Sequence, residues 1–337
     1  MGSFFSYGVE ERLGKKNHLL KLKDLIKWEK IRPLLKGIHK NEENSQGGPI
    51  AYDAVSMFKA LILGQWHNLS DPQLEESLRV RLDFMMFTGF ELGEDLPDET
   101  TLCRFRNKLI KRGLDRKLFK EINRQLENLS FEIHSAPGAL LDATIIESAA
   151  RPRRTIQITE DREEENGPQT CAYEIEESVD PDARWIKKGK KTYFGYKGFV
   201  RTAERTGFIQ YLQVEPANIS ETKNLESMVD GLSRGQALYA DKAYPSAKNN
   251  EFLKEKGVKN RIMKKGARNR ALSFWEKRFN YLVSKKRYLV EQTFGTLKRR
   301  FDMGRSRYMT TRKVEGQLWL KATCFNLLKA VRQVNYA

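Results

Sequence analysis

Two carboxylates lie where apolar β-strands normally carry Val or Ile. Asp142 falls within the run LLDATII, and Asp241 falls within LYADKAY. A carboxylate in a central strand loses hydration, so it needs a cation, hydrogen bonds or a metal ion as compensation. Asp241 has Lys242 beside it, whereas the nearest bases to Asp142 begin at Arg151. We therefore interpret both carboxylates as metal ligands; an ion pair with Lys242 is the simpler alternative for Asp241.

A third charged group lies in the run RYLVEQTFGTLKRRF. On a helix, Arg287, Glu291 and Lys298 fall within about 40° of one another on one face. An Arg–Glu pair four residues apart is most often a surface salt bridge. Its combination with two isolated strand carboxylates, in a strongly basic half of the chain, favours a functional group instead.

The charge of the chain indicates a polyanionic partner. The 337 residues carry 61 Lys and Arg against 44 Asp and Glu, a formal net charge of +17. Residues 160–182 hold ten acids and one base, whereas the chain from residue 183 onward holds 35 bases and 12 acids. This partition favours a cationic face that binds nucleic acid over an evenly solvated basic surface.

Several classes of function find no support. No G-x-x-x-x-G-K-[ST] motif occurs and no G-x-G-x-x-G opens a helix, so we expect no nucleotide cofactor. The three cysteines form no C-x-x-C pair, which argues against a zinc site. No apolar run reaches the roughly 18 residues of a membrane span. We expect a cytoplasmic protein with no membrane partner. All four histidines precede the predicted α/β region, and none of them pairs with a motif-like Ser or Cys: they are His18, His39, His67 and His134.

The spacing of apolar residues predicts helices first and a mixed sheet afterwards. We expect an N-terminal extension (1–48), a helical domain (49–130) and a mixed α/β domain (136–337) with an acidic insertion at about 150–190. The insertion is rich in Glu, Gln, Gly and Pro, which is typical of extended chain. In the α/β domain, apolar runs alternate with helical segments around one sheet. The runs are ALLDATIIES, YFGYKGFVRT, FIQYLQVEPAN, ALYADKAY and NRIMKK.

One helix of the helical domain has a cationic face. Pro97 and Asp98 start it, and Gly113 ends it. Its apolar side consists of Leu102, Phe105 and Leu109, and its opposite side carries Arg104, Lys108 and Lys111. These three cations are candidates for DNA contacts, although amphipathic surface helices commonly have the same pattern.

A tryptophan beside a lysine cluster is a further candidate for DNA contact. Trp185 lies on a predicted loop and is followed by Lys187, Lys188, Lys190 and Lys191. An indole can stack on an unpaired base while lysines bind its phosphates. The alternative is that Trp185 packs the insertion against the sheet, because tryptophan is highly buried on average.

The ordered set of motifs resembles the DDE transposases of bacterial insertion sequences, most closely insertion-sequence family five. The third acidic motif of that family is Tyr-x2-Arg-x3-Glu-x6-Lys. Arg287, Glu291 and Lys298 match it, whereas Ser284 holds the Tyr position. The resemblance covers about residues 50–335. Its other blocks are PDETTLCRFRNKL, LLDATIIES, DPDARWIKKGKKTYFGYK, LYADKAYPS, RNRALSFWEKRFN and QLWLKATCFNLLKA.

The resemblance implies a fold and a site. The fold is a helical DNA-binding domain followed by a ribonuclease-H-like catalytic domain with a C-terminal helix. The site is a catalytic, metal-binding triad of Asp142, Asp241 and Glu291 that holds two Mg²⁺ or Mn²⁺ ions. Arg287 and Lys298 are expected to contact phosphates beside the ions.

The implied activity is cleavage at the terminal inverted repeats of an insertion sequence and joining of the 3′-hydroxyls to target DNA. Its partners are then double-stranded DNA and, in the DNA complex, a second copy of the chain; the bound protein is expected on the bacterial nucleoid. Two alternatives remain: a decayed or domesticated sequence-specific DNA-binding protein, and a metal-dependent nuclease that does not join strands.

Overall fold

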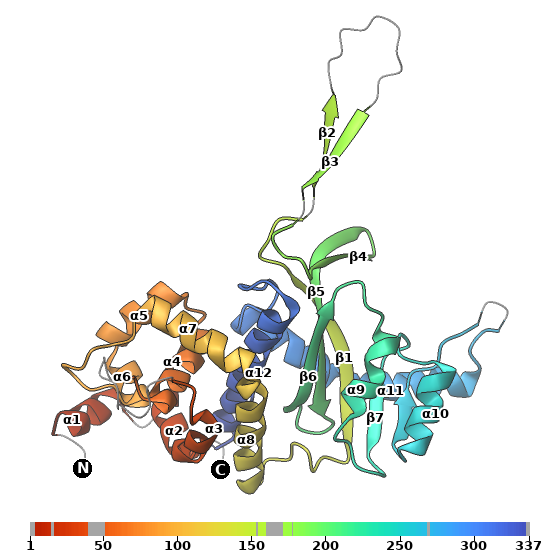
Figure 1. Cartoon of the computed structure of the whole chain (residues 1–337). Helices are drawn as coiled ribbons and strands as arrows, with labels where there is room; N and C mark the ends of the chain where they lie inside the picture. Colours follow the sequence, from red (N-terminus) through yellow and green to blue (C-terminus); the bar gives the residue numbers. More distant parts are fainter. Residues whose placement is uncertain are drawn as a thin grey trace, which may run out of the picture.

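The predicted change from helices to a mixed α/β layout is confirmed (Figure 1). The computed structural model describes residues 4–14, 17–39, 51–152, 154–159, 171–176, 178–267 and 270–334. The helical part contains α1 (Phe4–Leu13), α2 (His18–Leu25), the 3₁₀ turn η1 (Trp28–Ile31), α3 (Arg32–Leu35), α4 (Ala54–Trp66), α5 (Asp71–Val80), α6 (Leu82–Thr88), α7 (Glu99–Lys111) and α8 (Leu114–Asn128).

Side-chain caps fix where these helices begin. The carboxylate of Asp53 accepts a hydrogen bond from the Ser56 backbone N–H at the start of α4. Asp98 accepts one from the Thr101 backbone N–H at the start of α7, as the sequence predicted. Ser70 forms a reciprocal capping box with Gln73 before α5.

The segment before residue 40 packs on the rest of the helical part. Leu19 and Leu22 of α2 are buried in the same core as α4 and α6. The ring of Trp28 meets Phe87 edge to face, with centroids 5.3 Å apart. The described part of residues 1–48 therefore shares a hydrophobic core with the helices that follow.

A six-stranded mixed sheet forms the second part. Its strands are β1 (Gly138–Glu147), β4 (Arg184–Lys188), β5 (Lys191–Ala203), β6 (Ile209–Pro216), β7 (Ala237–Ala240) and β8 (Lys259–Ile262). β5 runs antiparallel to β1, and β4 and β6 both pair with β5. On the other side of β1, β7 and β8 are parallel to it and to each other.

The acidic segment contains strands that the sequence did not predict. β2 (Arg154–Thr159) and β3 (Cys171–Glu176) form a separate antiparallel pair that projects from the end of the main sheet (Figure 1). The predicted boundary of the insertion at about 190 is wrong, because β4 is already part of the main sheet. Several of its acids, from Glu160 to Glu165, lie outside the described residues.

Asp180 and Asp182, at the end of the acidic segment, tie the sheet to the last helix. Asp180 is fully buried and accepts hydrogen bonds from the Ser148 hydroxyl at 2.5 Å, the Thr310 backbone N–H at 3.1 Å and the Tyr196 hydroxyl. Asp182 accepts one from the Thr311 backbone N–H at 2.8 Å. These two carboxylates are therefore structural anchors, which the prediction of extended chain did not anticipate.

Helices cover both faces of the sheet. The turn η2 (Glu221–Asn224), α9 (Leu225–Val229) and α10 (Ala247–Glu255) lie over one face, where Leu141, Phe199 and Leu238 are buried. α11 (Phe274–Arg300) and α12 (Thr311–Val334) lie over the other. None of the helices in the described part of the chain has the length and apolarity needed to cross a bilayer.

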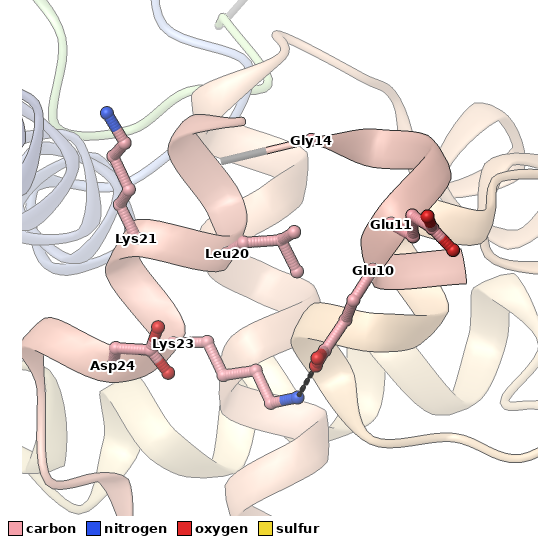
Figure 2. A pocket seen from close by; sticks show the side chains of 7 residues that line it. All are labelled: Glu10, Glu11, Gly14, Leu20, Lys21, Lys23 and Asp24. Atoms are coloured by element: carbon pink, nitrogen blue, oxygen red, sulfur yellow. Dashed lines mark hydrogen bonds and ion pairs between the residues drawn. The ribbon is translucent and has the colours of Figure 1, made fainter. Parts of the chain in front are cut away.

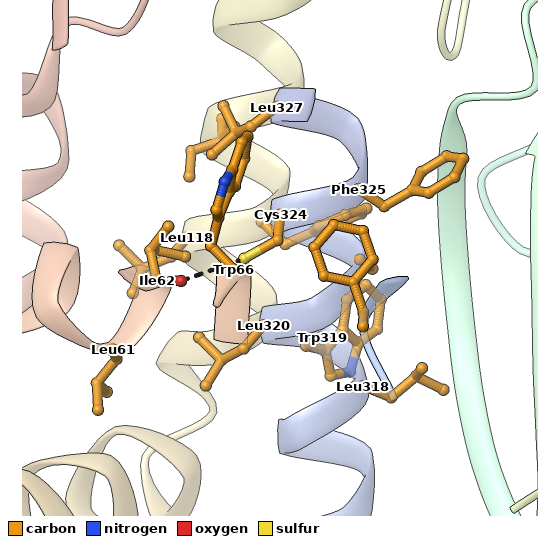
Figure 3. Packing of buried hydrophobic residues seen from close by; sticks show 14 of the residues in the cluster. Leu61, Ile62, Trp66, Leu118, Leu318, Trp319, Leu320, Cys324, Phe325 and Leu327 are labelled. Atoms are coloured by element: carbon orange, nitrogen blue, oxygen red, sulfur yellow. Dashed lines mark hydrogen bonds between the residues drawn. The ribbon is translucent and has the colours of Figure 1, made fainter. Parts of the chain in front are cut away.

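α12 joins the two parts of the molecule (Figure 1). It is buried nearly all round, which is typical of a helix inside a core rather than on a surface. The indole of Trp319 meets Phe119 of α8 at 4.9 Å and Tyr211 of β6 at 5.7 Å between centroids. Cys324 lies against Ile62 of α4 (Figure 3). One helix thus fixes the helical part against the sheet.

Candidate active site

Asp142 and Asp241 lie side by side because of strand register. β1 and β7 are parallel neighbours, and Leu141 pairs with Ala240. Asp142 follows Leu141, and Asp241 follows Ala240. Residues at matching positions of parallel strands point to the same face of a sheet. The two carboxylates, 99 residues apart in sequence, are therefore brought together at the end of β7.

Arg287 of α11 reaches both carboxylates. Its Nη2 lies 2.7 Å from Oδ2 of Asp142, and its Nη1 lies 3.8 Å from Oδ1 of Asp241. The Arg287 side chain is only 11% exposed. Lys242, the alternative partner of Asp241, contacts it with its backbone N–H. The compensating cation is thus Arg287, a residue that the sequence assigned to phosphate contacts.

Burial sets the electrostatics of this pair. It raises the pKa of Asp142 above its ordinary value, while the charge of Arg287 and a 2.9 Å hydrogen bond from the Ala143 backbone N–H oppose that shift. Burial, together with the negative charge of Asp142, also raises the pKa of Tyr244. The Tyr244 hydroxyl and the Nε of Arg287 are buried without a hydrogen-bond partner among the described residues. The site therefore holds unsatisfied polar groups beside the carboxylates.

Glu291 lies one helical turn beyond Arg287. It is exposed, and it has no ion-pair partner among the residues that the structure describes. No group of three or more His, Cys, Asp or Glu side chains in the described ranges is placed to hold a metal ion. The structure thus brings together Asp142, Asp241 and Arg287, and within the described ranges it does not bring Glu291 into a three-carboxylate group with them.

The donor chemistry nevertheless fits a divalent cation. Two carboxylates already converge on one cationic group, and all their donor atoms are the hard oxygens that Mg²⁺ and Mn²⁺ prefer. Glu291 projects from the helix that carries that group. Asp142 and Asp241 are therefore the carboxylates in this site that could hold a metal ion.

Lys298 lies near the lysine cluster. Partial burial and the charge of Lys188 lower its pKa, and Glu147 opposes that shift. Lys187 and Lys188 end β4. Lys190 lies in the two-residue turn that follows, and Lys191 begins β5. All four lysines are exposed. Gly189 occupies the turn with φ +62°, a conformation that glycine adopts without strain.

Trp185 is on a strand, so the predicted loop is wrong. It pairs with Phe194 across β4 and β5, and their rings lie 5.4 Å apart. Its side chain is 51% exposed. β4 lies at the edge of the sheet, which explains how a strand residue keeps half of its surface in water.

The cationic face of α7 is as predicted. Arg104, Lys108 and Lys111 are exposed, whereas Leu102, Phe105 and Leu109 are buried. The sequence missed Arg106, which is buried, binds Asp71 through two nitrogens at 2.6 and 2.8 Å, and stacks on Tyr308. Arg104, Lys108 and Lys111 are therefore available to a ligand, whereas Arg106 is not.

A pocket of about 500 Å³ lies between α1 and α2, and neither strand carboxylate lines it (Figure 2). Lys23 pairs with Glu10 across it at 3.1 Å. Its lining is Glu10, Glu11, Gly14, Leu20, Lys21, Lys23 and Asp24. Acids and bases are mixed in this lining, so the chemistry of the chain is better placed at the carboxylate pair.

Comparisons with known proteins show the family of the chain. The model of the transposase DDE domain matches residues 134–327, which include both strand carboxylates and α11. A transposase domain of the DUF772 family matches residues 8–108. The class defined by these matches is that of the DDE transposases.

A curated relative narrows the class. The transposase for insertion sequence element IS1106 of Neisseria meningitidis serogroup B is 41% identical over 233 residues, 69% of this chain and 78% of that protein. The chain belongs to the DDE transposases of bacterial insertion sequences, which confirms the resemblance seen in the sequence. Membership implies a metal-dependent enzyme that cuts and transfers DNA. No solved structure matches the chain.

Proposed function

We propose that this transposase binds the terminal inverted repeats of its insertion sequence, cleaves the strands at its ends and joins the 3′-hydroxyls to target DNA. The observation that carries the proposal is the register of β1 and β7, which places Asp142 beside Asp241 and under Arg287. The mixed sheet with helices on both faces supports a ribonuclease-H-like catalytic domain.

Each residue of the group has a role in this proposal. Asp142, Asp241 and Glu291 hold two Mg²⁺ or Mn²⁺ ions, which when bound activate the attacking oxygen and stabilise the leaving one in an in-line displacement. Arg287 neutralises the paired carboxylates and turns to a phosphate when DNA and cations arrive, since its guanidinium can bind either anion through two nitrogens. Lys298 binds the neighbouring phosphate.

We divide the chain by role as the sequence suggested. Residues 1–48 are an extension, 49–130 bind DNA and 136–337 carry the catalytic centre, with a segment inserted after the first strand that begins near residue 150 and ends before β4. The lysine-rich turn of β4 and β5 lies near Lys298, so it extends the phosphate path from the catalytic centre. Two copies act in the DNA complex, because an element has two ends.

The proposal is tested with a labelled duplex that carries one element end and the sequence that flanks it. We expect strand cleavage at the end in Mg²⁺, and joined products once a target duplex is added. Binding without cleavage in Mg²⁺ and in Mn²⁺ would identify a decayed, DNA-binding protein instead. Cleavage with no joined product would identify a nuclease.

The affinity for element ends should fall steeply with salt. Each phosphate contact releases condensed counterions, which gives a log–log slope of about −0.9 per contact. Changing Lys188 and Lys190 together to Gln should reduce the slope by about two if both contact phosphate. Anisotropy titrations from low to moderate salt measure the slope. An unchanged slope in the variant would remove the turn of β4 and β5 from the DNA path.

Changes on the cationic face of α7 should alter discrimination more than cleavage. Arg104→Gln with Lys108→Gln should reduce the preference for element ends over random duplex, because a helix that reads base edges carries specificity. Competition binding measures this ratio, and Lys117→Gln, on α8, is the matched control. If the variant loses equal affinity for both DNAs, α7 contacts phosphates only.

Trp185→Ala should reduce cleavage without unfolding the protein, because the ring is half exposed. A lost base stack costs about 1–3 kcal/mol. Substrates with unpaired ends should restore cleavage, since the ring is then not needed to hold the strands apart. Melting temperature and cleavage rate are measured together. A large drop in melting temperature with no rescue would instead show that Trp185 packs against Phe194 for stability.

A further inference from the structure

The outward face of α11 carries aromatic rings that the proposed function does not use. Phe274 and Trp275 are 73% and 77% exposed, and Tyr281 and Leu282 are half exposed. At 100° per residue, these side chains lie roughly 120–140° around the helix from Arg287. We call these four residues the outer stripe. It faces water, whereas Arg287 on the opposite side of the same helix faces the carboxylates.

Cations lie among the rings of the outer stripe. The ammonium of Lys285 is 4.7 Å from the centre of the Tyr281 ring, and the guanidinium of Arg278 is 5.7 Å from it. Lys277 is also exposed on this helix. The acids of α11 are Glu276, which caps the helix with Ser273 and pairs with Arg270, and Glu291. The surface is therefore both aromatic and positive.

This combination favours an unpaired nucleic-acid strand. A second copy of the chain would place lysines and arginines against each other, and the cores of protein interfaces are depleted of lysine. A duplex offers phosphates, but its base faces are stacked inside and leave the rings without partners. An unpaired strand offers phosphates to the cations and base faces to the rings.

We propose that the outer stripe binds an unpaired DNA strand, with bases stacked on Phe274, Trp275 and Tyr281 and with phosphates held by Arg278 and Lys285. Phe274 and Tyr281 are seven residues apart, about 10 Å along the helix. The inference rests on the proposed function, because strand cleavage at the inner face of α11 supplies a strand end that can leave the duplex.

The test uses the full chain, a 12-nucleotide oligo(dT), which forms no duplex, and a duplex of the same length. Oligo(dT) should quench the tryptophan fluorescence of the Trp185→Phe protein, and adding Trp275→Phe should abolish most of that quenching. Tyr281→Ala should weaken oligo(dT) binding roughly 5- to 150-fold, the effect of one lost stack. Tyr281→Phe keeps the ring and should bind as the wild type does. Duplex affinity should change little in all variants.

Three results would overturn the inference. They are equal losses on duplex and oligo(dT), unchanged oligo(dT) binding in both Tyr281→Ala and Trp275→Ala, and a dimer in sedimentation that dissociates in Tyr281→Ala. Because the side chains of Tyr281 and Trp275 are exposed, we expect the variants to fold. Melting temperatures check this. Asp142→Asn should bind oligo(dT) normally. If the wild-type protein binds oligo(dT) but does not cleave element ends, only the proposed function is refuted. If it cleaves element ends but does not bind oligo(dT), only the role of the outer stripe is refuted.

Discussion

Asp142→Asn should reduce strand cleavage at an element end at least about a thousandfold and leave end binding nearly unchanged. The amide keeps the size of the side chain but removes the charge that a divalent cation requires, and metal catalysis is worth several kcal/mol of barrier. The cationic residues that contact phosphate are untouched. Single-turnover cleavage in Mg²⁺ and anisotropy binding measure the two effects separately.

Asp95→Asn is the matched control for this change, because Asp95 is an exposed carboxylate in the helical part. It should cleave at the wild-type rate. Asp142→Asn should also melt close to the wild type, since it retains an oxygen that accepts from Arg287 and Ala143. Cleavage within tenfold of the wild-type rate would remove Asp142 from the catalytic centre.

Asp180→Ala should lower the free energy of unfolding by about 3–5 kcal/mol. The change leaves three donors without an acceptor in a buried site: the hydroxyls of Ser148 and Tyr196 and the backbone N–H of Thr310. Each unsatisfied buried group costs about 1–3 kcal/mol. Urea unfolding followed by circular dichroism measures the loss.

Two milder changes calibrate this prediction. Tyr196→Phe removes one donor and keeps the carboxylate, so it should cost about 1 kcal/mol. Asp182→Ala removes a single bond to the Thr311 backbone N–H and should cost about the same. If Asp180→Ala costs no more than these two variants, Asp180 is not the anchor that its burial indicates.

Local patterns were enough to predict most elements of the fold. Alternation and β-branching located β1, β5, β6, β7 and β8, and the caps at Asp53 and Asp98 located two helix starts. Both signals act within a few residues, so a single sequence contains them in full. The cationic face of α7 follows from the same local periodicity.

Long-range partners were not predictable in the same way. A sequence shows only which bases lie close to Asp142 along the chain. The base that forms an ion pair with Asp142 is Arg287, 145 residues away. The run from Arg287 to Leu297 also gave no clear apolar face, because Phe294 and Leu297 are buried on the side that carries Arg287. A charged residue on the buried face interrupts the apolar periodicity by which that face would be predicted. The packing of α11 on the sheet shows which face is buried.

Strands in the acidic segment were missed for a compositional reason. Charged and polar residues there suppress the apolar signal that identifies strands, and β4 carries Arg184, Lys187 and Lys188. Pairing with β5 nevertheless makes β4 a strand, through backbone hydrogen bonds that its side-chain composition does not predict.

Tyr244 of the candidate site had only a weak signal in the sequence, its position three residues after Asp241. Its burial beside Asp142 could be seen only once the fold was known.

The position of α12 in the chain also bears on how the protein is made. α4 and α8 have a large part of their apolar surface covered by a helix that the ribosome adds roughly 180 residues after α8. At about 5–20 residues per second, that delay is on the order of ten to forty seconds. During this time Trp66 and Phe119 lack the cover that α12 gives them, so chaperones that recognise apolar segments should bind ribosome-attached chains until α12 emerges.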